Sequence, residues 1–363
     1  MASARSGGWV PHDDIVISPE SDLTVQINEY RGEGTRKSLE RMAPLRVKRD
    51  TLINSSRYFQ TMMRSRCAES RNNTIVLEDD TVKSLEIWLR HFHGTLDVVT
   101  LDEISVADIW HVILASDKYQ FDRYDLLEWF IRWYRNATAA GIHRDNLANK
   151  LMLPCYAFDY ARGFQDLTTS LAYEEKGHIM EINPIENVRL HLPPRIIQQV
   201  IAAKGRLRNI LTRELFAKIN FLIETGSCSC KDETVFNYLR ELGKINVQPL
   251  EERSFSLVSV QSYLNRLQHF DQERMLRGMS RQPCSSCGIE WKRRVGKAIE
   301  VTAEYFDGLC LDCMKTTVKA DKEYWDHASY SERYDENCRI THGEPTHYFS
   351  LMARRDKRGL VAD

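Results

Sequence analysis

The sequence predicts three parts in order: an α+β domain with a small sheet and helices, a mostly α-helical region, and a cysteine-rich C-terminal module of irregular and helical structure. Near the N-terminus, segments of alternating apolar and polar residues are followed by segments with helical periodicity. A long amphipathic stretch then begins at Pro193-Pro194. Seven of the nine cysteines come after Gly226. A chain of 363 residues suits two or three such modules.

Shifts in composition set the expected boundaries. The first residues are rich in glycine and proline and show little periodicity, which is typical of a flexible leader. The predicted parts are a leader at 1–20, an α+β domain at 21–135, a helical linker domain at 136–225, a cysteine-rich module at 226–352 and a basic tail at 353–363.

Three strands are expected in the first domain. Leu23, Val25 and Ile27 alternate with polar residues, as in a half-buried strand. Leu45 with Val47 predicts a second short strand, and Thr74 to Leu77 a third. The polar stretch from Gly32 to Arg41 is expected to be a hairpin loop.

Capping residues predict where the helices of this domain begin. Asp50 is expected to cap a short helix through Asn54, and Ser55 or Ser56 to start the next one. The remaining predicted helices run from Thr81 to a stop at Gly94, from Ser105 with its capping partner Asp108 to Tyr119, and from Asp122 to Tyr134.

Blocks of this domain resemble a BTB/POZ domain over about Asp22 to Tyr134. The similar blocks are Ser21 to Val25, Leu45 to Leu52, Ser55 to Phe59 and Ile87 to Gly94. The resemblance implies association with protein partners through this domain, including self-association. It also implies a charged pocket near the dimer face of the family, formed here by Asp22 and Arg49.

A second feature of the resemblance is a hydrophobic-x-Glu motif with which some BTB adaptors bind a cullin scaffold. Cys67-Ala68-Glu69 lies at the matching place before Thr74. The resemblance thus implies a cullin contact through Cys67 and Glu69. The alternative is that Cys67 is a small buried residue and Glu69 a solvated loop charge.

Short helical stretches are expected after Tyr134, and Cys155 is expected to be a core residue. The proline pair before Arg195 suits the first turn of a long helix, which the apolar periodicity continues to about Ile223. Gly205 is expected to bend or divide this helix.

Two Cys-x-x-Cys knuckles are the strongest chemical signal in the chain: Cys284-Ser285-Ser286-Cys287 and Cys310-Leu311-Asp312-Cys313. Such a knuckle lets two thiolates reach one tetrahedral ion, and two knuckles complete a closed site with four cysteine ligands. Zinc is the expected ion, and an iron–sulfur cluster is the alternative.

Four further residues predict a second site. They are Cys228, Cys230, Cys338 and His342, which together supply three thiolates and one imidazole. The alternative pairing joins one knuckle with Cys228 and Cys230 and the other with Cys338 and His342, as in cross-braced zinc modules. The sequence does not choose between these pairings. The segments between the ligands are expected to be helical but to share little hydrophobic core. Metal binding is therefore expected to stabilise the fold of the module.

The C-terminal residues are also similar to the C-terminal block of BTB proteins of filamentous fungi. The similar segments are Tyr305 to Met314, Cys338-Arg339 and His342 to Thr346. This resemblance implies that the cysteine module and the BTB domain belong together.

Composition bears on the class of function. The net charge of -1, balanced in both end parts, argues against a face that binds nucleic acid, and no apolar run is long enough to span a membrane. Without a secretory leader, nine cysteines favour a reducing compartment, hence a cytoplasmic or nuclear location. The expected protein is a non-enzymatic adaptor or scaffold that links a client to a cullin-type ubiquitin ligase or another complex.

Two other functions are the alternatives to this expectation. A nuclear transcription regulator would use the zinc module to contact nucleic acid. A zinc-dependent deaminase would combine Pro283-Cys284-Ser285-Ser286-Cys287 with His342-Gly343-Glu344, but the two motifs come in the wrong order along the chain.

Overall fold

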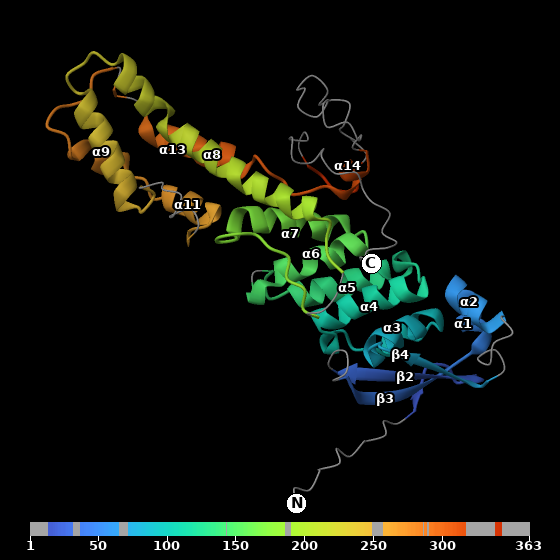
Figure 1. The fold of residues 1–363 in the computed structure, drawn as a ribbon. Helices are drawn as coiled ribbons and strands as arrows, with labels where there is room; N and C mark the ends of the chain where they lie inside the picture. The colour runs from blue at the N-terminus through green and yellow to red at the C-terminus, as the bar shows by residue number, and fades with distance from the viewer. Residues whose placement is uncertain are drawn as a thin grey trace, which may run out of the picture. The chain divides into compact units, whose positions relative to one another are not determined.

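The computed structural model describes residues 14–31, 37–64, 72–142, 144–185, 190–248, 257–285, 287–288, 290–316 and 338–342. The chain divides into two compact units (Figure 1). The first contains the described residues up to Tyr160 together with Ile182–His191, and the second contains Ala161–Glu181 and the described residues from Leu192 onwards. The boundary lies inside 136–225, the range that the sequence assigned to one helical linker domain.

The first unit contains a four-stranded sheet in the order β1-β3-β2-β4. The strands are β1 (Ile15–Val16), β2 (Leu23–Arg31), β3 (Ser38–Val47) and β4 (Thr74–Glu78). Strands β2 and β3 are antiparallel, whereas β1 pairs with β3 and β4 pairs with β2 in parallel. The three predicted strands are confirmed, and the alternating residues Leu23, Val25 and Ile27 are buried.

The hairpin between β2 and β3 is longer than predicted. Ser38 and Leu39 were assigned to a polar loop, but they pair with Arg31 and Tyr30. A register shift next to Glu29 lets the pairing continue beyond Arg41. The residues at the start of β3 are mostly polar and exposed, so they lack the alternation of apolar and polar residues by which a strand is predicted from sequence.

Helices follow the strands in the first unit. They are α1 (Arg49–Ser55), α2 (Arg57–Arg64), α3 (Val82–Phe92), α4 (Val106–Tyr119), α5 (Leu127–Thr138) and α6 (Leu147–Ala157), with 3-10 turns at Leu96–Val98, Leu101–Glu103, Arg123–Leu126 and Arg144–Asn146. Thr81, Ser105 and Asp122 cap their helices as predicted. Ser56 accepts a hydrogen bond from the Phe59 N–H at the start of α2.

The N-terminus of α1 differs from the prediction, because Asp50 lies within the first turn and does not cap it. The Asp22 carboxylate instead accepts a hydrogen bond of 2.7 Å from the Arg49 N–H, and His93 Nε2 accepts one from the Lys48 N–H. A carboxylate at this position also complements the positive end of the helix dipole. The cap therefore comes from residues distant in sequence.

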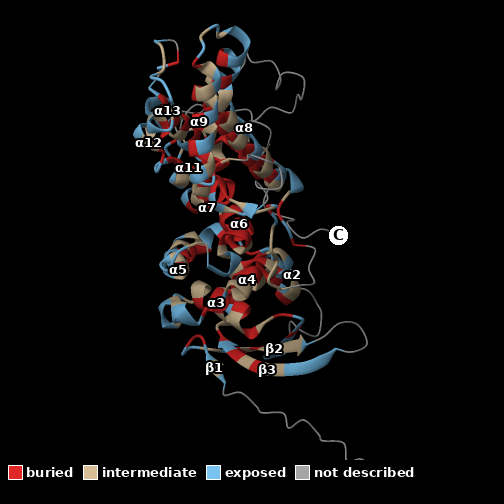
Figure 2. Cartoon of the chain, turned by 90° about the vertical axis from the view of Figure 1, so that its left-hand side faces the viewer, coloured by how far each residue is buried: buried red, intermediate tan, exposed pale blue. Residues whose placement is uncertain are grey.

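Buried tryptophans connect the helices of the first unit. Helix α3 lies against β2 and β3, α4 against α3, and α6 against α4. The indole N–H of Trp88 donates to the Val112 carbonyl, and that of Trp110 donates to the Lys150 carbonyl. The buried faces of α3 and α4 are red in Figure 2. Each tryptophan thus adds both apolar area and a hydrogen bond between helices.

The second unit is helical in its described part. Its helices are α7 (Ala161–Glu174), α8 (Pro194–Thr225), α9 (Lys231–Lys244), α11 (Val260–Leu267), α12 (Gln272–Arg277), α13 (Trp291–Ala303) and α14 (Leu311–Thr316). The long helix α8 begins at Pro194 as predicted. It runs through Gly205 without a break, so the expected division at this glycine is wrong.

The second unit also has a substantial core, contrary to the prediction of little core between its helices. Helix α13 lies along α8 in Figure 1. The ring of Tyr238 on α9 lies 4.3 Å from that of Trp291 on α13 in a tilted contact and 5.6 Å from that of Phe270 in an edge-on contact, and all three residues are buried. The apolar residues of this core are spread over several short helices, so the sequence pattern did not predict that they pack together.

The structure as a whole is mixed α/β, with the small sheet near the N-terminus and the cysteine clusters towards the C-terminus. Among the described residues, no helix combines the length and apolar character needed to cross a membrane.

Candidate metal centres

Eight predicted ligands form two groups in the second unit. Site A contains Cys228, Cys230, Cys284 and Cys287, and site B contains Cys310, Cys313, Cys338 and His342. Within each site the ligand atoms all lie within 4.8 Å of one another. The pairing of both knuckles around one ion is therefore wrong, and the ligands are grouped as in the alternative pairing. The groups follow one another along the chain rather than being cross-braced.

Site A joins the turn between α8 and α9 to the loop before α13. Cys228 lies in that turn, and Cys230 immediately precedes α9. The knuckle closes through a hydrogen bond of 3.0 Å from the Cys287 N–H to the Cys284 carbonyl. The Cys284 N–H points at Cys230 Sγ at 3.4 Å, and Cys228 Sγ lies 3.2 Å from Cys287 Sγ.

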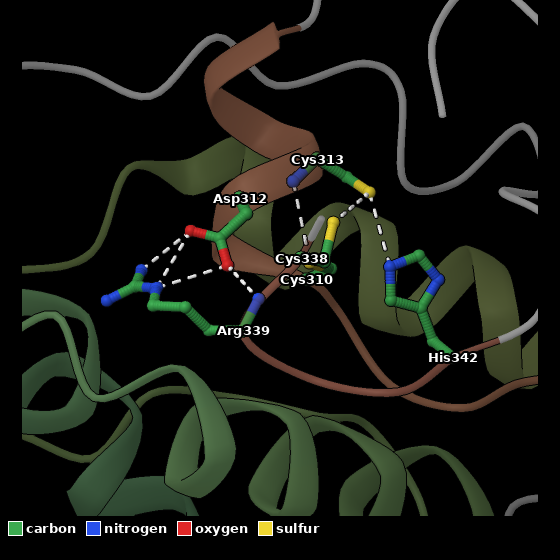
Figure 3. A network of polar contacts seen from close by, with 6 residues as sticks. All are labelled: Cys310, Asp312, Cys313, Cys338, Arg339 and His342. Atoms are coloured by element: carbon green, nitrogen blue, oxygen red, sulfur yellow. Dashed lines mark hydrogen bonds and ion pairs between the residues drawn. The ribbon is translucent and has the colours of Figure 1, made fainter. Parts of the chain in front are cut away.

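Site B is built on α7 and the start of α14. The Leu309 N–H donates to Thr168 Oγ1 on α7 at 2.9 Å, which places the knuckle that begins at Cys310. The Cys313 N–H points at Cys310 Sγ at 3.4 Å. Cys313 Sγ lies 3.6 Å from Cys338 Sγ and 3.4 Å from His342 Nε2. Dashed lines mark both contacts in Figure 3.

The ligand spacing in site B fits a tetrahedral zinc ion. With Zn–S bonds of about 2.3 Å and Zn–N bonds of about 2.0–2.1 Å, tetrahedral angles place two sulfurs about 3.8 Å apart and sulfur and nitrogen about 3.6 Å apart. The separations of 3.6 Å and 3.4 Å around Cys313 are close to these values. Three of the four ligands of site B are buried, as are two in site A.

The electrostatics of site B also favour a cation. A hydrogen bond from Cys313 lowers the pKa of the Cys310 thiol to about 4, and His342 adds to this effect. The same contact, together with burial, raises the pKa of Cys313, and burial raises that of Cys338 to about 11. A divalent ion would remove the repulsion between neighbouring thiolates and let all three release their protons.

Two contacts around site B were missed by the sequence reasoning. The Asp312 carboxylate binds the Arg339 guanidinium, and the Gln165 side-chain amide on α7 donates to the Thr341 carbonyl at 3.1 Å. Asp312 lies inside a knuckle and Arg339 directly follows a ligand, so the opposite charges next to the ligands were the available signal.

The residues of the expected charged pocket are neighbours, but their geometry differs from a simple ion pair. Asp22 is exposed and accepts from the Arg49 backbone, while the Arg49 guanidinium donates to the Asn72 carbonyl at 2.6 Å. Cys67 and Glu69, the expected cullin contact, lie outside the described residues. Cys155 is fully buried, which confirms its place in the core.

The clusters also bear on the deaminase alternative, which needs Cys284, Cys287 and His342 around one ion. The structure places the two cysteines in site A and the histidine in site B. These three residues therefore do not meet around one ion. No protein-family model matches the chain, and no curated protein matches it significantly.

Proposed function

We propose that this chain is a non-enzymatic scaffold for protein association, with a BTB/POZ-type domain in its first unit and a second unit held by two structural zinc ions. The observation that carries the proposal is that each cluster offers four protein ligands. Four such ligands saturate a tetrahedral zinc ion, so neither site keeps a position for a water or a substrate. Metal chemistry of the hydrolytic kind would need that open position.

Association with other proteins is supported by the resemblance of the first domain to BTB/POZ domains. Its strands and helices occur in the order expected from the matching blocks, and α1 begins where Asp22 and Arg49 meet. A cullin scaffold is the proposed partner, since the Cys67-Ala68-Glu69 motif resembles the one with which some BTB adaptors bind a cullin.

Zinc content per chain tests the metal part of this proposal. We expect two zinc ions in protein purified without added metal, measured by elemental analysis. Cys228→Ser with Cys284→Ser should remove one ion, and Cys313→Ser with His342→Ala should remove the other. Cys155→Ser is the matched control and should retain both ions, because this thiol lies outside both clusters. A wild-type chain without zinc would contradict the proposal.

The partner part is tested by a binding assay with a purified cullin scaffold. Glu69→Ala should weaken binding. Glu103→Ala should not, because Glu103 is an exposed acidic residue on the 3-10 turn Leu101–Glu103 and is not part of the motif. Absence of binding by the wild-type chain would refute the cullin assignment and leave the zinc assignment standing.

A further inference from the structure

The last two ligands of site B reach it on a segment without regular secondary structure. Residues 338–342 are neither helix nor strand, and they follow the knuckle at a distance along the chain. Backbone hydrogen bonds of a helix or sheet therefore do not place Cys338 and His342. Their position depends on contacts made by side chains.

The strongest of these contacts joins residues adjacent to the ligands. Arg339 donates from Nη2 to Asp312 Oδ1 at 2.8 Å, and from Nε to Oδ1 and Oδ2 at 3.0 Å and 3.1 Å. The Arg339 backbone N–H also donates to Asp312 Oδ2 at 2.9 Å. Asp312 lies between Cys310 and Cys313, and Arg339 follows Cys338, so one ion pair joins the two halves of the site (Figure 3).

The ion pair is more than an ordinary surface contact. The Asp312 side chain is only 12% exposed and that of Arg339 is 41% exposed. A planar guanidinium that meets both carboxylate oxygens fixes orientation as well as distance, which a lysine cannot do. The Gln165 contact to the Thr341 carbonyl and the burial of Ile340 also hold the same segment.

We propose that Asp312 and Arg339 are positioning residues that hold Cys338 and His342 against the knuckle and so set the affinity of site B for metal. The inference rests on the proposed function, in which site B takes a zinc ion. Without this ion pair, the binding of metal must itself order residues 338–342, and the entropy cost of that ordering lowers the affinity. Loss of such supporting contacts around a metal commonly lowers metal affinity by about 10–100-fold.

Cadmium-113 NMR of the full chain distinguishes the two sites, since four sulfur ligands and three sulfur ligands with one nitrogen give different resonances. The probe is cadmium alone, bound in place of zinc and withdrawn by increasing EDTA. We expect Arg339→Gln to release the site B signal at an EDTA concentration about 10–100-fold lower than in wild type. The site A signal should be released as before.

Two further variants separate positioning from general destabilisation. Arg339→Lys keeps the charge but loses the two-pronged geometry, so its site B affinity should lie between those of wild type and Arg339→Gln. Arg213→Gln is the matched control, because it breaks an exposed ion pair with Glu214 on α8 and should change neither signal.

The outcomes distinguish this inference from the one on which it rests. The positioning role alone would be overturned if wild type gives both signals and Arg339→Gln releases the site B signal at the same EDTA concentration as wild type. A wild-type chain with no site B signal would overturn the zinc assignment of that site and the positioning role with it. Equal loss of both signals in Arg339→Gln would also overturn it, since the effect would then not be local.

Discussion

Replacement of Gly308 by alanine should destabilise the second unit. Gly308 has a φ of +93°, a conformation that residues with a Cβ rarely adopt. A Cβ at this position would lie 2.5 Å from Thr169 Oγ1 and would also overlap the Gln165 carbonyl oxygen, both on α7. The loop must approach α7 this closely for the Leu309 N–H to reach Thr168.

Two terms set the size of the effect. A left-handed conformation costs a residue with a Cβ about 1–2 kcal/mol. The displacement needed to relieve an overlap in a packed region costs about 1–3 kcal/mol more. We therefore expect a loss of about 2–5 kcal/mol, which corresponds to a fall of roughly 5–15 °C in the unfolding midpoint of a unit of this size.

Gly205 provides the opposite case within the same unit. It lies inside α8, and a Cβ there would meet no atom within 4 Å. Gly205→Ala should therefore stabilise the helix by about 0.5–1 kcal/mol, because glycine loses more backbone entropy than alanine on folding.

Thermal unfolding measures the stability of both variants, and hydrogen exchange with mass spectrometry shows which helices change in protection. Peptides from α7 should lose protection in Gly308→Ala, those from α8 should gain it in Gly205→Ala, and peptides from β2 in the first unit serve as an internal reference. Unchanged protection of α7 in Gly308→Ala would refute the argument from close approach. Destabilisation by Gly205→Ala would refute the argument from open space.

Two pH effects follow from the buried Lys204 and the half-buried His111. Burial lowers the pKa of Lys204 from 10.5 to about 8. Between these two pH values the unfolded chain binds more protons than the folded chain, so the free energy of unfolding rises with pH. Denaturant unfolding should show a rise of roughly 3 kcal/mol in wild type and none in Lys204→Met. Burial also lowers the pKa of His111 below 6.5, although Asp108 and Asp80 oppose it, so stability should fall as the pH drops below 6.5, by at most about 1.4 kcal/mol per pH unit. His111→Gln should flatten this acid limb, and an unchanged limb would contradict the assignment.

The residues of the two candidate metal sites were predictable from sequence, but their pairing was not. A Cys-x-x-Cys knuckle is a local feature, and its spacing alone brings two thiolates together. Nothing local says which second pair completes the site, because Cys228 and Cys230 offer the same chemistry to either knuckle. That choice is made by the packing of α9 against α12, which brings the turn before α9 towards the loop before α13.

Helix caps show the same division between local and distant information. Ser105 with Asp108, and Thr81 with Ser84, are contacts within one turn and could be predicted from spacing. The cap of α1 by Asp22 joins residues separated by the whole β2–β3 hairpin, and local spacing instead pointed to Asp50. The Gln165 contact to Thr341 likewise required the fold, because these residues are 176 positions apart.

The core of the second unit limits what the proposed metal ions have to do. A structural zinc site can contribute on the order of 10–16 kcal/mol of apparent binding free energy, which would decide the folding of a segment with no core of its own. Here Tyr238 on α9, Trp291 on α13 and Phe270 between α11 and α12 form a buried aromatic cluster. Loss of an ion should therefore loosen the ligands of its site, while α8 and α13 keep their mutual contact. The proposed ions would therefore connect segments that lack backbone pairing, and they would not be the sole organisers of the unit.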